Sequence, residues 1–149
     1  PMAELATFQV VDLMNSSFPL ARDLRQSAAG AVVAELLLTF CPPDEPAPRR
    51  YRLGAAALDA LLAGCDPDRV VAYVQFWVLQ LGGLMPPPTD LEGNTSTDEL
   101  AFFIACRRVP LADLTLDVPP SAARRFDAMV RHDAERPLRA LDFFRKHGG

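Results

Sequence analysis

The chain has 149 residues, 50% of them hydrophobic and 23% charged, and a net charge of −4. This length suits one domain with a real core, and the composition is that of an ordinary soluble globular protein. The longest apolar candidate, residues 70–85, is interrupted by polar residues and glycines and is shorter than the ~20 residues that a membrane helix needs, so no membrane role is expected.

The three cysteines, Cys41, Cys65 and Cys106, are few, odd in number and widely spaced. This pattern argues against a disulfide framework and indicates a reducing compartment. The chain also begins without the basic and apolar stretches of a signal peptide. We therefore expect a cytoplasmic protein.

The first predicted elements are a short strand and two helices. Residues 4–11 are partly β-branched or aromatic and alternate loosely, which indicates a strand or an extended lead-in. A helix is expected from Leu20 to about Phe40, where apolar residues recur at steps of three and four. Four prolines within residues 42–48 end it, and a second helix is expected over residues 49–62.

The third predicted helix carries the clearest signals. The sequence Asp66-Pro67-Asp68 supplies a cap, a first-turn proline and an acid near the positive end of the helix dipole. Phe76 lies off the main apolar stripe, so the helix should be buried on two sides. Trp77, in mid-stripe, is expected to be a core residue rather than a ligand-stacking one. The stripe consists of Val70, Tyr73, Val74, Trp77, Val78 and Leu81.

The last third of the chain begins with a long polar loop, residues 84–98. Residues 100–109 are apolar and fit either a strand or a helix. Two further helices are expected, over about residues 119–132 and 136–145. The sequence therefore predicts a single, mainly α domain over residues 1–149, a compact bundle of about five helices with a long loop after the third.

The net charge is unevenly distributed. Residues 119–149 contain seven basic and four acidic side chains, a net charge of +3, so the preceding 118 residues carry −7. Arginine side chains suit carboxylates and phosphates, so this segment could meet an acidic partner or nucleic acid. The alternative is a solvated helix face, which the interspersed acids favour.

The residues needed for catalysis and for metal binding are scarce. His132 and His147 are the only histidines, and neither lies near a glycine-rich nucleophile motif. No two Cys or His residues have the close spacing of zinc ligands, and no phosphate-binding glycine motif is present. We therefore predict a protein that is not an enzyme and holds no metal and no cofactor.

Several short motifs, in order and along nearly the whole chain, resemble the RecO family of bacterial recombination mediators. The matching segments are Leu5–Phe8, Phe18–Leu24, Ala34–Leu37, Tyr73–Pro86 and Pro137–Phe144. The resemblance implies the family's C-terminal helical domain, without the OB-fold that precedes it in the family. Many members have two cysteine pairs for zinc after the third-helix motif, whereas residues 86–105 here contain no cysteine.

The resemblance also implies a function and partners. RecO proteins act in DNA repair in the RecF, RecO and RecR pathway. They help load RecA on single-stranded DNA coated by single-stranded-DNA-binding protein, and they anneal complementary strands. RecR is a partner, and single-stranded DNA is contacted mainly through the OB-fold. The helical part docks the acidic, apolar-ended tail of the single-stranded-DNA-binding protein.

Such a tail needs an apolar pocket for its last side chain and an arginine for its carboxylates. Arg69, Arg107 and Arg108 are the residues that we select for this role, with solvated surface arginines as the alternative. Two other functions stay open. One is a helical regulatory or dimerisation domain unrelated to DNA repair. The other is a small-molecule-binding domain with a pocket between the second and third helices.

Overall fold

The computed structural model describes residues 24–40, 48–86 and 95–147. Within these ranges the chain forms six α-helices and one short 3-10 helix, and no strand. The prediction of a mainly helical bundle is confirmed. The predicted strand at residues 4–11, the helix start near Leu20 and most of the long loop lie outside the described residues.

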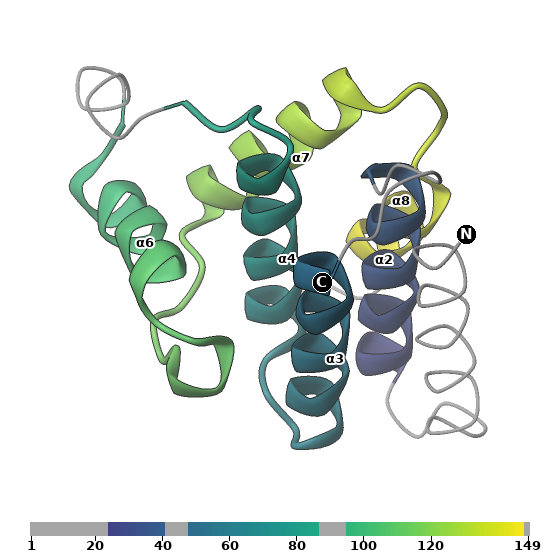
Figure 1. The fold of residues 1–149 in the computed structure, drawn as a ribbon, viewed down its shortest axis with the longest axis horizontal. Helices are drawn as coiled ribbons and strands as arrows, with labels where there is room; N and C mark the ends of the chain where they lie inside the picture. Colours follow the sequence, from purple (N-terminus) through teal and green to yellow (C-terminus); the bar gives the residue numbers. More distant parts are fainter. Residues whose placement is uncertain (1–23, 41–47, 87–94, 148–149) are drawn as a thin grey trace.

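The elements are α2 (Leu24–Phe40), α3 (Pro48–Leu62), α4 (Pro67–Leu81), α6 (Thr97–Arg108), η2 (Leu111–Asp113), α7 (Pro120–Asp133) and α8 (Arg139–His147). Figure 1 shows α4 in the middle of the domain, with α2 and α3 to one side and α6 to the other. Helix α4 packs against α2, α3, α6 and α7, while α8 packs against α2. The central position of α4 makes it the main wall of the core.

The sequence signals at α4 act as predicted. The Asp66 carboxylate accepts a hydrogen bond from the backbone N–H of Asp68 at 3.1 Å, and Pro67 stands in the first turn. Ten of the helix's fifteen residues are buried, including Phe76 and Gln75 on a second face. The prediction that this helix is buried on two sides is confirmed.

The segment that the sequence left undecided, residues 100–109, belongs to helix α6. The Ser96 hydroxyl accepts from the backbone N–H of Glu99 at 3.2 Å and caps the helix. Acids stand in its first turn, and Arg107 and Arg108 stand in its last, so both ends suit the helix dipole. This helix accounts for the difference between the five predicted and the six observed.

Buried polar contacts fasten the last two helices to the rest. The Asp127 carboxylate accepts hydrogen bonds from Gln75 at 2.7 Å and from Arg145 at 2.7 and 2.8 Å. The Glu35 carboxylate accepts from two backbone N–H groups in the first turn of α8, at 2.9 and 3.1 Å. Glu35 therefore caps α8 from a residue on α2, about one hundred positions earlier in the chain.

Most of the basic side chains in the segment 119–149 already have partners within the domain. Four of its seven basic side chains have partners in the described chain: Arg125 with Glu99, Arg131 with Asp142, Arg136 with Thr39, and Arg145 with Asp127. These contacts reduce the charge that the segment can offer to an external anion. The observation fits the alternative interpretation of this segment as a solvated helix face.

Candidate functional site

Two pockets flank the C-terminal half of α4. The first, which we call the α4–α6 pocket, has a volume of about 140 Å³. Its lining consists of Phe76, Met85, Pro86, Phe103, Ile104, Arg107 and Arg108. Five of these side chains are apolar and two are arginines, and no acid from the described ranges lines the pocket. It has room for one apolar side chain with a cationic rim.

The floor of the α4–α6 pocket is fixed by aromatic packing. Phe76 and Phe103 are 1% and 3% exposed, and both rings contact Phe126 of α7, with centroids 6.3 and 5.0 Å apart. Aromatic pairs at these separations contribute beyond the area they bury. The floor therefore belongs to the core, and its shape does not depend on a ligand.

The turn after α4 brings Met85 and Pro86 to the pocket. Gly83 has φ +72°, a conformation that side-chain-bearing residues rarely adopt, and the backbone N–H of Leu84 donates to the Leu79 carbonyl at 2.8 Å. This closure ends the helix and reverses the chain, so the apolar residues that follow return toward α6. The glycines that end α4, Gly82 and Gly83, thus also help to position part of the site.

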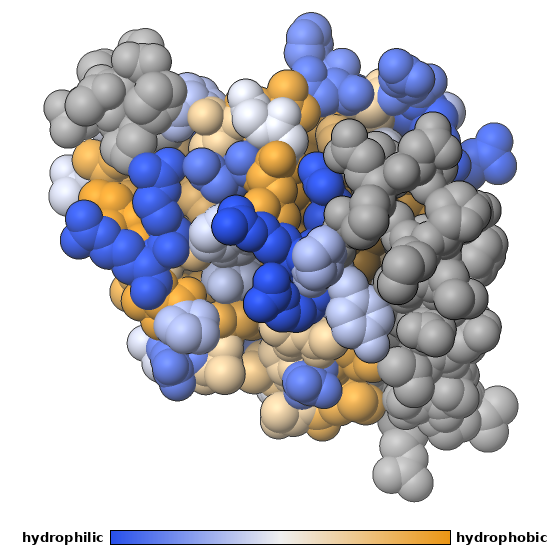
Figure 2. All heavy atoms as spheres, in the orientation of Figure 1, coloured by the Kyte–Doolittle hydropathy of each residue, from blue (hydrophilic) through white to orange (hydrophobic). Residues whose placement is uncertain are grey.

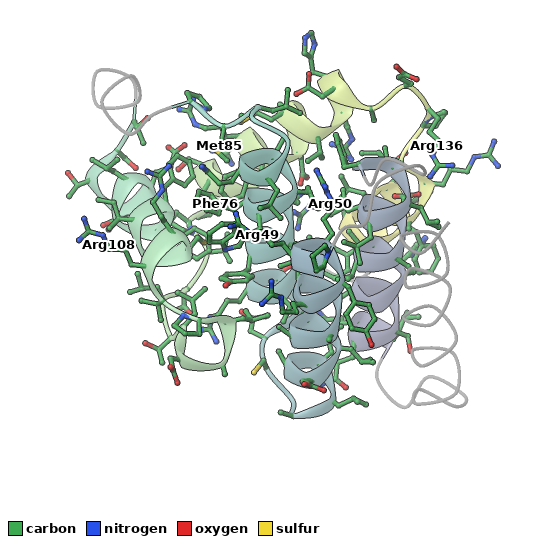
Figure 3. All side chains as sticks on the ribbon, in the orientation of Figure 1. Arg49, Arg50, Phe76, Met85, Arg108 and Arg136 are labelled. Atoms are coloured by element: carbon green, nitrogen blue, oxygen red, sulfur yellow. The ribbon has the colours of Figure 1, made fainter. Side chains whose placement is uncertain are left out.

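The two arginines at the pocket rim come from the last turn of α6. Arg107 donates to the Gln80 side-chain oxygen at 3.1 Å, which ties it to α4. Arg108 is exposed and has no hydrogen bond or ion pair to the described residues. In Figure 3 it lies on the α6 side of the molecule, to one side of Phe76 and Met85. One arginine is held in place, and the other is available to an anion.

The second pocket, which we call the α3–α4 pocket, is larger, at about 410 Å³. Its lining consists of Arg49, Arg52, Leu53, Ala56, Tyr73, Trp77 and Leu81. Arg49, Arg52 and Ala56 recur at helical spacing along one face of α3, and all three are exposed. Here too the charged lining residues in the described part of the chain are arginines.

Tyr73 and Trp77 form the aromatic wall of the α3–α4 pocket. The indole N–H of Trp77 donates to the Cys106 carbonyl at 3.0 Å, and the Tyr73 ring lies 6.4 Å from it, centroid to centroid. Burial raises the pKa of the Tyr73 hydroxyl, so this group stays neutral and does not repel an anion. Trp77, expected to be a core residue, is partly buried: it packs against the core and also lines this pocket.

The comparisons with known proteins identify the family. The family model "Recombination protein O C terminal" matches residues 21–136, which span every element from α2 to α7 and both pockets. The chain belongs to this family. The resemblance to RecO is confirmed, and the domain has a RecO-like role in DNA repair and recombination. No curated protein and no solved structure matches the chain.

The structure separates the three site residues predicted for this RecO-family domain. Arg107 and Arg108 lie together at the rim of the α4–α6 pocket. Arg69 lines neither pocket. Its guanidinium donates to the carbonyls of Leu116 at 2.8 Å and Thr115 at 3.2 Å, and it pairs with Asp117 at 3.3 Å. Arg69 is therefore a structural residue that holds the segment between η2 and α7.

Arg49 and Arg52 were missed as site residues. A usable signal exists in the sequence, because Arg49, Arg50 and Arg52 follow immediately after a proline-rich segment that ends a helix. One alternative in the sequence analysis placed a pocket between the second and third predicted helices. These helices are α3 and α4, and the α3–α4 pocket lies between them. The arginines on its edge indicate an anionic ligand.

Other kinds of site find no support in the described part of the chain. No three His, Cys, Asp or Glu side chains gather there as metal ligands do. None of the described helices is long and apolar enough to cross a bilayer. Cys106 is buried, and burial raises its pKa to about 12, which keeps the thiol protonated.

Proposed function

We propose that this RecO-family domain is a protein-docking module without catalysis of its own, and that its α4–α6 pocket binds the acidic, apolar-ended tail of single-stranded-DNA-binding protein. One observation carries the proposal: a pocket of one-side-chain size whose floor is aromatic and whose charged lining residues, among those that the structure describes, are Arg107 and Arg108. A peptide terminus needs these same two features, an apolar cleft and a guanidinium for carboxylates.

The apolar and the acidic parts of the tail would contact different parts of the pocket, the floor and the rim. A terminal apolar side chain would lie on Phe76, Met85 and Phe103, where it leaves water. The terminal carboxylate and a neighbouring acid would meet the guanidinium groups. The rigid fork of arginine accepts a carboxylate through paired hydrogen bonds, which a lysine ammonium cannot match. The preformed floor lowers the ordering cost of binding.

Family membership supports the wider role. Within the RecF, RecO and RecR pathway, docking on the tail would bring the mediator to coated single-stranded DNA, where RecA is loaded and complementary strands anneal. RecR and single-stranded DNA are the other partners that we propose. The net charge of −4 favours weak DNA binding by this chain itself.

The test is a titration of a fluorescein-labelled tail peptide against the parent chain and the Arg108→Glu variant, followed by fluorescence anisotropy. We expect Arg108→Glu to weaken binding by about 1–3 kcal/mol, the usual contribution of a charged hydrogen bond. The melting temperature should fall only slightly, because Arg108 is exposed and a cation in the last turn of a helix contributes only about 0.3–1 kcal/mol.

The matched control is Arg124→Glu, which makes the same charge change on α7 at a residue that lines neither pocket. It should bind the peptide as the parent does. A tail peptide with an amidated C-terminus should bind more weakly than the free acid. No binding of the parent at high micromolar concentration would reject the tail as partner, and equal loss in both variants would reject the pocket.

A further inference from the structure

Helix α4 lines both pockets. The rings of Phe76 and Trp77, one from each pocket, have centroids 5.4 Å apart. Arg107, which lines the α4–α6 pocket, donates to Gln80, the residue before Leu81 of the α3–α4 pocket, and we call this bonded pair the Gln80–Arg107 ridge. Figure 2 shows hydrophilic and hydrophobic patches side by side on this face, and in Figure 3 Arg49 overlaps α4 while Arg108 lies on the α6 side.

Among the described residues, the charged side chains that line the two pockets are all arginines. Arg49 and Arg52 line the α3–α4 pocket, and Arg107 and Arg108 line the α4–α6 pocket. No described acidic residue lines either pocket, although the chain as a whole carries −4. Arg49 forms no hydrogen bond or ion pair with the described residues, and Arg52 donates only to the Pro48 carbonyl of its own helix, at 3.3 Å. These guanidinium groups are available to an external carboxylate.

From this geometry we infer that the two pockets form one continuous docking groove, and that the acidic residues preceding the peptide terminus cross the Gln80–Arg107 ridge to reach Arg49 and Arg52. The inference rests on the proposed function and deepens it. The smaller α4–α6 pocket holds the terminal side chain, and the larger α3–α4 pocket holds the upstream acidic segment.

The length required of the peptide follows from helix dimensions. An α-helix with its side chains is about 10–12 Å wide, and an extended peptide advances about 3.3 Å per residue. Crossing α4 therefore takes roughly four residues. With its last residue in the α4–α6 pocket, a peptide of four residues does not complete the crossing, whereas one of nine residues reaches both pockets.

The α3–α4 pocket fits an acidic peptide better than nucleic acid. Base stacking needs an exposed ring face, but Tyr73 is 9% exposed and Trp77 is partly buried against the core. The floor is aliphatic, formed by Leu53, Ala56 and Leu81. Carboxylates at the rim and small apolar side chains on the floor suit this lining.

Trp77 provides the reporter, because it is the chain's only tryptophan and lines the α3–α4 pocket. We compare a four-residue and a nine-residue version of the acidic tail, both with free carboxyl termini. We expect the longer peptide to bind about tenfold more tightly, the effect of one charge-assisted hydrogen bond. Only the longer peptide should change the Trp77 emission.

The deciding variant is Arg49→Glu/Arg52→Glu, with Arg124→Glu/Arg139→Glu as a control of equal charge on α7 and α8. The first should erase the advantage of the longer peptide and leave the affinity for the shorter one unchanged. The control should keep the advantage. Melting curves check that both variants fold.

The outcomes separate the two proposals. Equal affinity of both peptides for the parent overturns the groove and leaves the proposed function standing. Binding of neither peptide overturns the proposed function, and the groove with it. In a third outcome, a single-stranded oligonucleotide changes the Trp77 emission, neither peptide does, and the Arg49→Glu/Arg52→Glu variant abolishes the change. That result assigns the α3–α4 pocket to nucleic acid and also overturns the groove.

Discussion

Replacement of Arg69 by alanine should destabilise the domain without changing peptide binding. The Arg69 side chain is 16% exposed and donates to two backbone carbonyls, of Leu116 and Thr115, at 2.8 and 3.2 Å. A net contribution of about 0.5–1.5 kcal/mol is typical of one intramolecular hydrogen bond, and more when one partner is charged. The two together suggest a loss of about 2 kcal/mol in the free energy of unfolding.

The third contact of Arg69, the ion pair with Asp117, adds little to this value. The Asp117 side chain is 98% exposed, so water screens the pair. Asp117→Ala therefore serves as the matched control, since it removes the ion pair and keeps both carbonyl contacts. Its free energy of unfolding should equal that of the parent within experimental error.

The assay is urea unfolding followed by circular dichroism, together with titration of the tail peptide. For a two-state domain the midpoint falls while the slope stays constant. An Arg69→Ala variant as stable as the parent would show that the 115–117 segment does not depend on this side chain. An Arg69→Ala variant that is as stable as the parent but binds the peptide much more weakly would show that Arg69 belongs to the docking site. It would refute the assignment of Arg69 as a structural residue.

Two further predictions concern buried groups. Asp127→Ala should destabilise the domain by about 3 kcal/mol in urea unfolding, since it leaves Gln75 and Arg145 without their buried partner. The control Asp142→Ala, at a side chain that is 61% exposed, should have little effect in the same assay. Burial raises the pKa of Cys106 to about 12, so iodoacetamide at pH 8 should label the partly exposed Cys65 and spare Cys106 in the native protein. Peptide mapping measures the labelling, and equal labelling of the two cysteines would contradict the buried position of Cys106.

The helical fold was largely predictable because its signals are local. Asp66 and Pro67 mark the start of α4, and Gly82 and Gly83 mark its end, within a few residues of the backbone groups that they satisfy. The segment 100–109 was harder to assign. Its apolar run is short, and the cap at Ser96 that makes it a helix follows a long polar loop, so periodicity alone could not decide.

The site was predictable only in part, because long-range contacts decide which arginines are available. Arg107 and Arg108 could be selected as a basic pair after an apolar segment, and the structure places them at a pocket rim; their binding role stays a prediction. Arg69 looks equivalent in sequence, but its partners lie 46 to 48 positions away. Nothing near Arg69 in the sequence reveals that its hydrogen bonds are already made.

The distribution of arginines within the fold gives the strongest reason to look for function on the face formed by α3, α4 and α6. Arg69 and Arg145 have side chains only 16% and 26% exposed, and each is bound to backbone carbonyls or carboxylates of distant elements. Arg49 and Arg108 are exposed beside apolar pockets and have no such partners among the described residues. Structure alone accounts for the first kind of arginine. The second kind has no such contacts, although Arg108 suits the dipole at the end of α6, and an anionic partner would give both arginines a role.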